Sequence, residues 1–397
     1  MKAVGIIAEY NPLHNGHLYH LEESKKLAGT DAVVVAMSGN FCQRGEPAIL
    51  DKWERSRLAV SNGADVVIEI PTLFCLGNSM QYGKAGVKLL DSLGVVSHLS
   101  FGSESGDIES LNLVANNLKV SKNEIETIIS YLAKNEGLSY PRARELAYEK
   151  LFGSENVNIL SNSNDNLALS YLQENSSMKP IAVKRCGAGY DDDIVDSYEF
   201  QSASGIRTAI IKETEFKKYV PGNVYESLEN HIKTCPDEWL NCLKYAVLTM
   251  DEAEIEHCPS AGDGLGNKIK SEIGKAKTWD ELIKSVKSKR YTYSRISRLC
   301  IQIILGINRN SFKFESPNYV RILALSKKGR ELVAYSEKNE LNELPVITNI
   351  NKQKGWLDED GLKLLKLDVH ASDVYNLVTG RNHESCSDYR TTPFIQE

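Results

Sequence analysis

The chain has 397 residues, a length that predicts two or three domains. Its content of 42% hydrophobic and 25% charged residues is typical of a soluble globular protein, and no segment approaches the ~18 uninterrupted apolar residues of a membrane-spanning helix. With a net charge of −6, the protein repels polyanions on average, so binding of a nucleic acid requires a local basic patch.

The cysteines and the N-terminus point to the cytoplasm. None of the eight cysteines forms a CxxC pair, and no Cys/His group has the spacing of a zinc site. The apolar run "AVGIIAEY" is too short for a signal peptide and predicts a strand instead. Scattered single cysteines without a secretion signal suggest reduced thiols in a cytoplasmic protein.

Strands and helices alternate over the first hundred residues. The strands are predicted at 3–10, 32–38, 64–71 and 95–102, and the helices from about Gly16, at 51–63 and at 80–93. Because the strands are apolar on both faces, they predict a parallel sheet covered by helices on both sides. The ligand site of such an α/β fold lies at the carboxyl ends of the strands.

The rest of the chain is predicted to be mainly helical. Helices are expected over 107–151 and near 164–174, a strand at 180–187, and a further helix from about Ser204. Helical periodicity then dominates from 215 to about 308, and the last ~80 residues mix short apolar runs with helices. We therefore predict an α/β catalytic domain over 1–213 and a mainly α-helical region over 214–397.

The segment "LHNGH" lies between the first strand and the first helix, where an α/β fold binds phosphate. Backbone N–H groups and the helix dipole favour an anion there, and Gly16 permits close approach of the backbone. His14 and His17 can both donate hydrogen bonds to phosphate oxygens, including those of a departing pyrophosphate. A zinc site lacks further ligands and a pH switch has no support; a simple packing role remains open for His20.

Residues 284–298, "KSVKSKRYTYSRISR", form a basic run without an acidic residue. Basic side chains neutralise phosphates and tyrosines stack on unpaired bases, so this run is a candidate RNA-binding patch; the alternative is the solvated end of a helix. Its members are Lys284, Lys287, Lys289, Arg290, Tyr291, Tyr293, Arg295 and Arg298.

The HxGH segment resembles the signature of the HIGH-type nucleotidyltransferase superfamily, which has a Rossmann-like fold. The superfamily's second phosphate motif is matched by "SASGIRTAI", which supplies Ser202, Ser204 and Arg207. Longer segments, among them "KAVGIIAEYNPLHNGHLYHL", "AVVVAMSGNFCQRGEPAILDKWERSRLA", "SFGSESGD" and "YVRILALSKKG", are similar to the bacterial tRNA(Met) cytidine acetate ligase family (TmcAL). The resemblance runs from residue 2 to about 330.

This resemblance implies an activity and a set of site residues. The family forms acetyl-adenylate from acetate and ATP and acetylates N4 of the wobble cytidine of elongator tRNA(Met), without acetyl-CoA and without a membrane. His14, His17, Ser204 and Arg207 are the implied catalytic residues, with Ser204 as N-cap or phosphate donor and Arg207 on the β/γ-phosphates. The implied ATP-binding residues are Ile7, Ala8, Glu9, Tyr10, Asn11, Pro12, Leu13, His14, Asn15, Gly16, His17, Leu18, Tyr19, His20, Gly102, Asn164 and Arg185.

Two features qualify the resemblance. The family commonly has Phe at the position of Leu13 and Thr near Ser204–Gly205, and neither change removes a donor or a charge. Mg²⁺ is expected to be held mainly by the ATP phosphates, since no protein cage for a metal is evident.

Three alternative functions remain. They are a small-molecule adenylyltransferase, a non-catalytic RNA-binding protein and, with less support because no KMSKS-like sequence occurs, a class I aminoacyl-tRNA synthetase.

Overall fold

The computed structural model describes residues 1–397 except 176, 186–199, 231–235, 289–290, 311–313 and 381–386. The strands are β1 (Ala3–Ala8), β2 (Val33–Ser38), β3 (Val66–Ile70), β4 (Val96–Ser103), β5 (Lys179–Lys184), β6 (Val320–Leu325), β7 (Val346–Ile347) and β8 (Phe394–Ile395). The α-helices are α1 (Asn15–Ala28), α2 (Lys52–Ser61), α3 (Thr72–Cys75), α4 (Ser79–Asp91), α5 (Ile108–Val120), α6 (Lys122–Glu136), α7 (Tyr140–Phe152), α8 (Asn158–Ser161), α9 (Ser163–Glu174), α10 (Ala203–Ile211), α11 (Gly222–Asn230), α12 (Leu240–Thr249), α13 (Glu252–Glu256), α14 (Leu265–Glu272), α15 (Trp279–Val286), α16 (Tyr293–Ile304), α17 (Lys327–Lys338), α18 (Ile350–Gln353), α19 (Glu359–Val378) and α20 (Ser387–Arg390).

One sheet organises the fold, with the strand order β5-β4-β1-β2-β3-β6-β7 and with β8 paired to β6. Strands β1 to β5 are parallel, as predicted, whereas β6 runs antiparallel to β3. From β1 the chain continues to β2, which pairs with one edge of β1, and it later returns to the other edge of β1 as β4. The order of the strands therefore reverses at β1, which is the place where open α/β sheets bind ligands.

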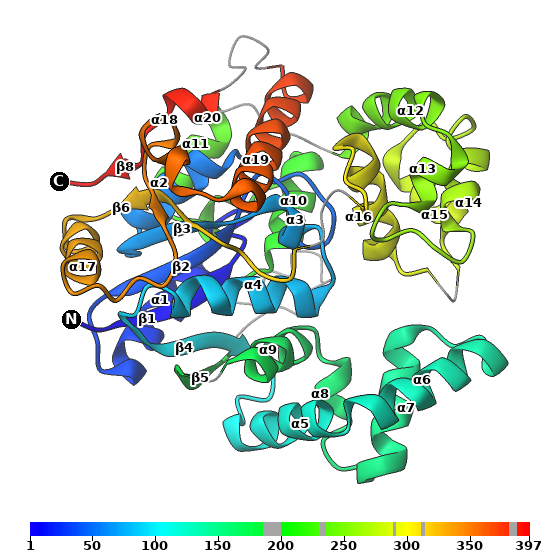
Figure 1. Cartoon of the computed structure of the whole chain (residues 1–397), viewed down its shortest axis with the longest axis horizontal. Helices are drawn as coiled ribbons and strands as arrows, with labels where there is room; N and C mark the ends of the chain where they lie inside the picture. The colour runs from blue at the N-terminus through cyan, green and yellow to red at the C-terminus, as the bar shows by residue number, and fades with distance from the viewer. Residues whose placement is uncertain (176, 186–199, 231–235, 289–290, 311–313, 381–386) are drawn as a thin grey trace.

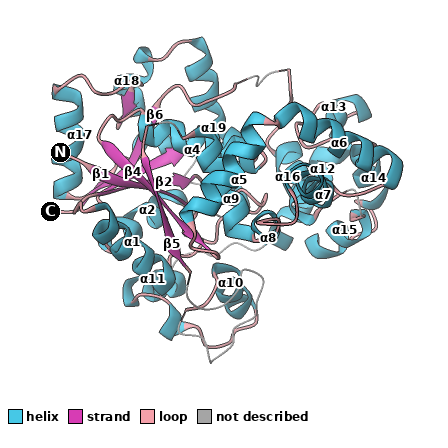
Figure 2. Ribbon diagram, turned by 90° about the horizontal axis from the view of Figure 1, so that it is seen from below, coloured by secondary structure: helices cyan, strands magenta, loops and turns pink. Residues whose placement is uncertain are grey.

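Both faces of the sheet are covered, as the apolar strands predicted (Figure 2). Successive residues of β2 point to opposite faces: Val33, Val35 and Met37 pack with α1, α2, α10 and α11, whereas Val34 and Ala36 pack with α4 and its neighbours. All residues of β2 and β3 are buried. This two-sided burial explains why these strands lack an alternation of apolar and polar residues.

Two groups of helices lie on the same side of the sheet (Figure 1). Helices α5 to α9 follow β4, and helices α12 to α16 form a separate apolar core that contacts Phe41, Leu76 and the helix α19. The last strands, β6 to β8, then rejoin the sheet beside β3. The boundary predicted near residue 213 therefore does not separate the sheet from the rest, because the apolar run at 320–325 completes an edge that would otherwise expose unpaired backbone groups.

In the part of the chain that the structure describes, no helix combines the length and the hydropathy needed to cross a membrane. The described residues likewise contain no group of three or more His, Cys, Asp or Glu side chains arranged to hold a metal ion.

Candidate active site

The HxGH segment follows β1 and begins α1, as predicted, and its two histidines form the helix cap. His14 is the N-cap residue, and its Nδ1 accepts a hydrogen bond from the backbone N–H of Gly16 at 3.1 Å. The Nδ1 of His17 in turn accepts from the backbone N–H of His14 at 3.3 Å. The two rings stack with their centroids 3.7 Å apart. This is a reciprocal capping box in which imidazoles take the roles usually played by Ser and Glu.

The cap fixes the tautomer of both histidines. A ring nitrogen that accepts a hydrogen bond carries no hydrogen, so the proton of each neutral imidazole resides on Nε2. Burial, with the nearby charge of Arg185, lowers the pKa of His14 to about 3, and burial and His14 lower the pKa of His17 well below its ordinary value. Both rings are therefore neutral at pH 7, and each offers one Nε2–H donor.

Gly16 maintains this arrangement. A Cβ atom at this position would lie 3.0 Å from the Cε1 atom of His14 and would displace the imidazole. His20 lies on the next turn, where its Nε2 contacts the Oγ of Ser100 on β4 at 3.1 Å. Burial and Arg185 lower its pKa to about 4. His20 therefore both packs against the sheet and lines the cavity described below.

The second motif, at 202–207, lies at the start of α10. The N-cap residue is Ser202, whose Oγ accepts from the N–H of Gly205 at 3.0 Å, so Ser204 is not the cap. Ser204 occupies the first turn, and its Oγ is 3.1 Å from that of Ser202. Arg207 reaches back to the first motif, where it donates to the carbonyl oxygen of Asn11 at 2.8 Å and to Glu46 Oε2 at 3.1 Å. The two motifs are therefore joined directly.

The other predicted nucleotide-binding residues form a corner at the ends of β4 and β5. Arg185 donates to Asn164 Oδ1 at 3.2 Å, and its side chain crosses over Gly102, where a Cβ atom would lie 3.5 Å from Arg185 Cγ. Glu104 caps the start of α9 by accepting from the N–H of Asn164 at 3.1 Å and of Asp165 at 2.9 Å. The fully buried Asp165 accepts in return from the N–H of Glu104 at 3.0 Å. This exchange fixes α9 to the end of β4.

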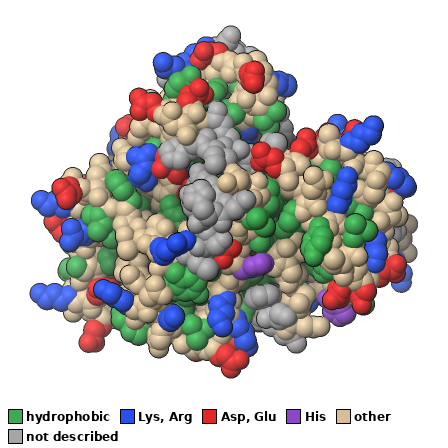
Figure 3. All heavy atoms as spheres, turned by 90° about the horizontal axis from the view of Figure 1, so that it is seen from above, with side chains coloured by type: hydrophobic (Ala, Val, Ile, Leu, Met, Phe, Trp, Pro, Cys, Tyr) green, Lys and Arg blue, Asp and Glu red, His purple; other side chains and the backbone are tan. Residues whose placement is uncertain are grey.

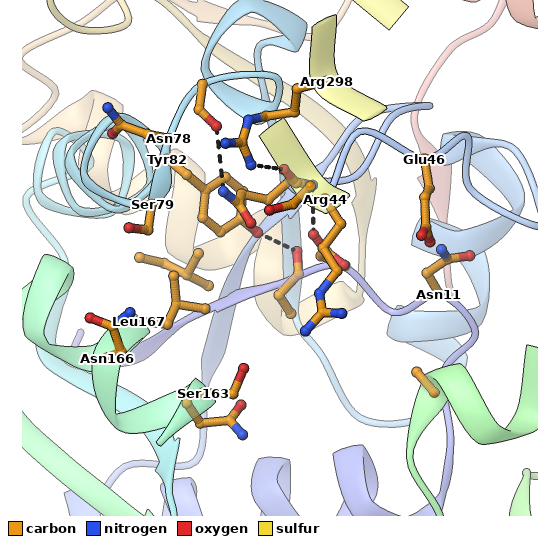
Figure 4. Close-up of a pocket in the computed structure, with 18 of the residues that line it drawn as sticks. Asn11, Arg44, Glu46, Asn78, Ser79, Tyr82, Ser163, Asn166, Leu167 and Arg298 are labelled. Atoms are coloured by element: carbon orange, nitrogen blue, oxygen red, sulfur yellow. Dashed lines mark hydrogen bonds between the residues drawn. The ribbon is translucent and has the colours of Figure 1, made fainter. Parts of the chain in front are cut away.

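These parts line one cavity of about 2570 Å³ between the sheet and both groups of helices. Figure 4 shows Ser79 and Tyr82 of α4 and the N-cap residue Asn78 above Ser163, Asn166 and Leu167 of α9, with Asn11 and Glu46 across from them. All four implied catalytic residues and Gly102, Asn164 and Arg185 line it. Of the predicted loop residues, Pro12, Leu13, Asn15 and Leu18 do not, and Leu13 and Leu18 pack in the core beneath.

The residues that line the cavity are more basic than the protein as a whole. Lys and Arg outnumber Asp and Glu among its lining residues, although the chain carries a net charge of −6. On the described part of the face in Figure 3, by contrast, basic and acidic side chains are interspersed. Focused positive charge in a concave site favours a polyanionic ligand.

The sequence did not single out the loop 39–50, which connects the site to the second group of helices. Gln43 donates its N–H to Glu9 Oε1 at 2.7 Å, and the Oγ of Ser297 donates to the carbonyl oxygen of Gly45 at 2.7 Å. Glu46 and Arg44 of this loop line the cavity. The loop follows β2, so the rule that ligands bind at the carboxyl ends of strands could have found it.

The candidate RNA-binding patch is only partly open. Tyr291 is 8% exposed, lies 5.5 Å beneath the guanidinium of Arg295 and donates its hydroxyl to the carbonyl oxygen of Asp263, so it presents no free face for stacking. Lys284 pairs with Asp280 at 2.6 Å, and Lys287 is exposed. Tyr293, Arg295 and Arg298 line the cavity. Lys289 and Arg290 lie outside the described residues.

Known proteins are similar to this chain over its whole length. A family model described as HIGH Nucleotidyl Transferase matches residues 1–389. A tRNA(Met) cytidine acetate ligase of Clostridium perfringens is 37% identical over the full length of both chains, and one of Thermoanaerobacter sp. is 39% identical over 95% of each. The crystal structure of Thermotoga maritima TmcAL, 30% identical, superposes with a TM-score of 0.92 over the whole of both chains, and the form bound with alpha-thio ATP superposes with a TM-score of 0.89.

Proposed function

This chain belongs to the HIGH nucleotidyl transferase family, and we propose that it is an ATP-dependent acetate ligase that acts on elongator tRNA(Met). It forms acetyl-adenylate from acetate and ATP and transfers the acetyl group to N4 of the wobble cytidine. The observation that carries the proposal is the histidine pair, whose Nε2–H donors are fixed by the helix cap in the same cavity as Arg207, Asn164 and Arg185. The names of full-length relatives support the substrates.

The chemistry needs no protein nucleophile. An oxygen of the acetate carboxylate attacks the α-phosphorus, the bond to the bridging oxygen breaks, and pyrophosphate leaves with the electron pair. His14, His17, Ser204 and Arg207 stabilise the charge that develops on the leaving group. N4 of cytidine then attacks the acetyl carbonyl carbon, AMP leaves, and N4 loses a proton. The protein therefore aligns its substrates and neutralises charge.

We also propose that Mg²⁺ enters with ATP and that the enzyme works in the cytoplasm with its tRNA. Mg²⁺ usually keeps several waters and binds through one or two carboxylates plus phosphate oxygens. Glu9, which lines the cavity beside the histidine loop, fits this limited need. The ion would offset the charge of the phosphates when the acetate anion approaches.

Incubation with labelled acetate, ATP and tRNA(Met) tests the proposal. Mass spectrometry of the digested tRNA should show labelled N4-acetylcytidine, with AMP and pyrophosphate as by-products and no need for acetyl-CoA. Parallel reactions replace acetate with nicotinamide mononucleotide or with amino acids. A dinucleotide product would identify a small-molecule adenylyltransferase instead, and an amino-acid adenylate would identify a synthetase.

Glu46 is expected to weaken the binding of ATP, because its carboxylate competes with phosphate for Arg207. In Glu46→Gln, Arg207 keeps its bond to Asn11 and loses only the charged partner, so we expect the KM for ATP to fall by about two- to fivefold, the scale of a partly exposed ion pair. Steady-state kinetics of pyrophosphate exchange measure this. Glu315→Gln, which removes a cavity carboxylate that pairs with Lys84, is the control. An increase in KM would show that Glu46 instead positions Arg207 for binding.

A further inference from the structure

We propose that helices α5 to α7 form a second RNA-binding wall of the active-site cavity, opposite Tyr293, Arg295 and Arg298 of the basic run. This wall, named the α5–α7 wall here, consists of Lys119, Lys122, Tyr140 and Arg144, all of which line the cavity. The proposal rests on the proposed function and adds to it the surface that receives the RNA. The ligand is a single-stranded or loop segment of RNA, recognised through its phosphates and one unstacked base.

The four side chains of the wall come from three helices and line the same cavity. Lys119 and Lys122 lie three residues apart where α5 meets α6, and both are exposed. Tyr140 and Arg144 lie one turn apart on α7, so they occupy the same side of that helix. The hydroxyl of Tyr140 donates to Glu126 Oε1 of α6 at 2.8 Å, which fixes α7 against α6.

The basic side chains of this wall form no close ion pair in the described part of the chain. Arg144 is half-buried and donates to a neutral partner, Asn166 Oδ1, at 2.6 Å. Burial lowers its pKa, and the nearby charge of Glu126 opposes this shift without outweighing it. Among the described residues, no carboxylate lies within ion-pair distance of Arg144, Lys119 or Lys122. A partly buried cation without a carboxylate in direct contact is costly, so it favours an anionic ligand.

Arg298 is a second partly buried guanidinium group, on the opposite side of the cavity. Its Nη1 donates to the carbonyl oxygen of Gln43 at 3.3 Å, and its buried Nε has no hydrogen-bond partner. Burial and the charge of Arg295 lower its pKa to about 10. Two guanidinium groups that form no ion pair with a carboxylate of the described residues therefore face one cavity from two separate groups of helices, as a polyanion held between two walls requires.

The wall lies next to the predicted nucleotide site. Asn166, the partner of Arg144, is two residues from Asn164, the partner of Arg185, in the first turn of α9. Phosphates bound at Arg144 would therefore place an RNA nucleotide beside the predicted nucleotide site.

The wall also has the aromatic side chain that a single-stranded RNA site needs. Tyr140 is 52% exposed, whereas Tyr291 of the opposite patch is 8% exposed. Stacking of a base on an aromatic ring contributes about 1–3 kcal/mol and requires an open ring face. An exposed aromatic ring together with basic residues, the combination sought in residues 284–298, therefore occurs on the α5–α7 wall.

Binding of an anticodon-arm RNA at several salt concentrations tests the wall. In Lys119→Glu/Lys122→Glu we expect affinity to fall by about tenfold or more and the salt dependence to lose about 1.5 units of slope, as for two phosphate contacts. Tyr140→Ala should weaken binding, and Tyr140→Phe, which keeps the ring and loses the bond to Glu126, should restore most of it. Lys134→Glu, an exposed lysine of α6 outside the cavity, is the matched control.

Acetate-dependent pyrophosphate exchange without RNA separates this inference from the proposed function. We expect wild-type exchange in the double variant, because the exposed lysines contact the RNA alone. Unchanged RNA affinity in the double variant, or a loss equal to that of Lys134→Glu, would overturn the inference. Absence of acetate-dependent exchange from the wild type would instead contradict the proposed function, while the RNA-binding result would still decide the wall.

Discussion

Replacing His14 with Asn, or His17 with Gln, should reduce the rate of acetate-dependent pyrophosphate exchange by about 10²–10³-fold each, the cost of removing one donor to a developing anion. Both substitutions keep the helix cap. Asn is a favourable N-cap residue, and Gln at the third helical position can still accept from the backbone N–H of residue 14. The change therefore removes the Nε2–H donor and leaves α1 anchored.

Alanine substitutions would mix two effects, because His14→Ala removes both the donor and a cap that stabilises the helix by about 1 kcal/mol. Circular dichroism and thermal unfolding of the Asn and Gln variants should match the wild type. His98→Gln is the control, because His98 lies in β4 outside the cavity, where its Nδ1 contacts Ser97. Wild-type exchange in both His14→Asn and His17→Gln would show that the pair is only a helix cap.

Asp388→Asn should lower the free energy of unfolding by about 3–5 kcal/mol, because it leaves two buried cations, Lys52 and Arg321, to share the single carboxylate of Glu69. Asp388 binds Lys52 Nζ at 2.7 Å and Arg321 Nη1 at 2.8 Å, and Glu69 completes the network with Lys52 at 2.7 Å. Burial opposes ionisation of Asp388, but Arg321 and Lys52 outweigh it and lower its pKa. Because the folded pKa is below the unfolded one, this stabilisation is present at neutral pH and is lost as the pH falls below about 4.

Urea unfolding measures the effect, with Glu359→Gln as a control that removes an exposed partner of Lys363 and should cost no more than about 0.5 kcal/mol. The double variant Lys52→Met/Asp388→Asn restores the balance of charge. Its loss of unfolding free energy should therefore be smaller than the sum of the losses in the two single variants. A loss below about 1 kcal/mol in Asp388→Asn would contradict a dry, fully paired network. Because Asn40 at the start of the loop 39–50 accepts from the N–H of Lys52 at 2.7 Å, the network also supports the loop that reaches the active site.

The central layer of the fold was predictable because its signals are local. Buried strands such as β2 and β3 are short apolar runs between turn residues, and the order of strand, HxGH and helix places the histidines at the end of β1. The return of β6 to the sheet was not predictable. Its six buried residues differ little from those of a parallel core strand, and its partner β3 lies about 250 residues away in the sequence.

In the candidate site, too, the local features were predictable and the long-range contacts were not. The HxGH and SASGIR motifs each predicted the start of a helix at a phosphate-binding site. The hydrogen bond from Arg207 to Asn11 was not predictable, because it joins residues 196 apart in the sequence. The spacing of residues 284–298 did not show that the ring of Tyr291 is covered by Arg295. The α5–α7 wall has no motif, because its basic residues come from three helices whose faces are aligned only in the fold.

Exchange of labelled pyrophosphate into ATP, with and without acetate, tests the central claim most directly. The wild type should exchange label only when acetate is present, and the variant His14→Asn/His17→Gln should lose this exchange while it remains folded. Exchange that is absent from the wild type with acetate, or that survives in the double variant, would contradict acetyl-adenylate formation at the histidine pair.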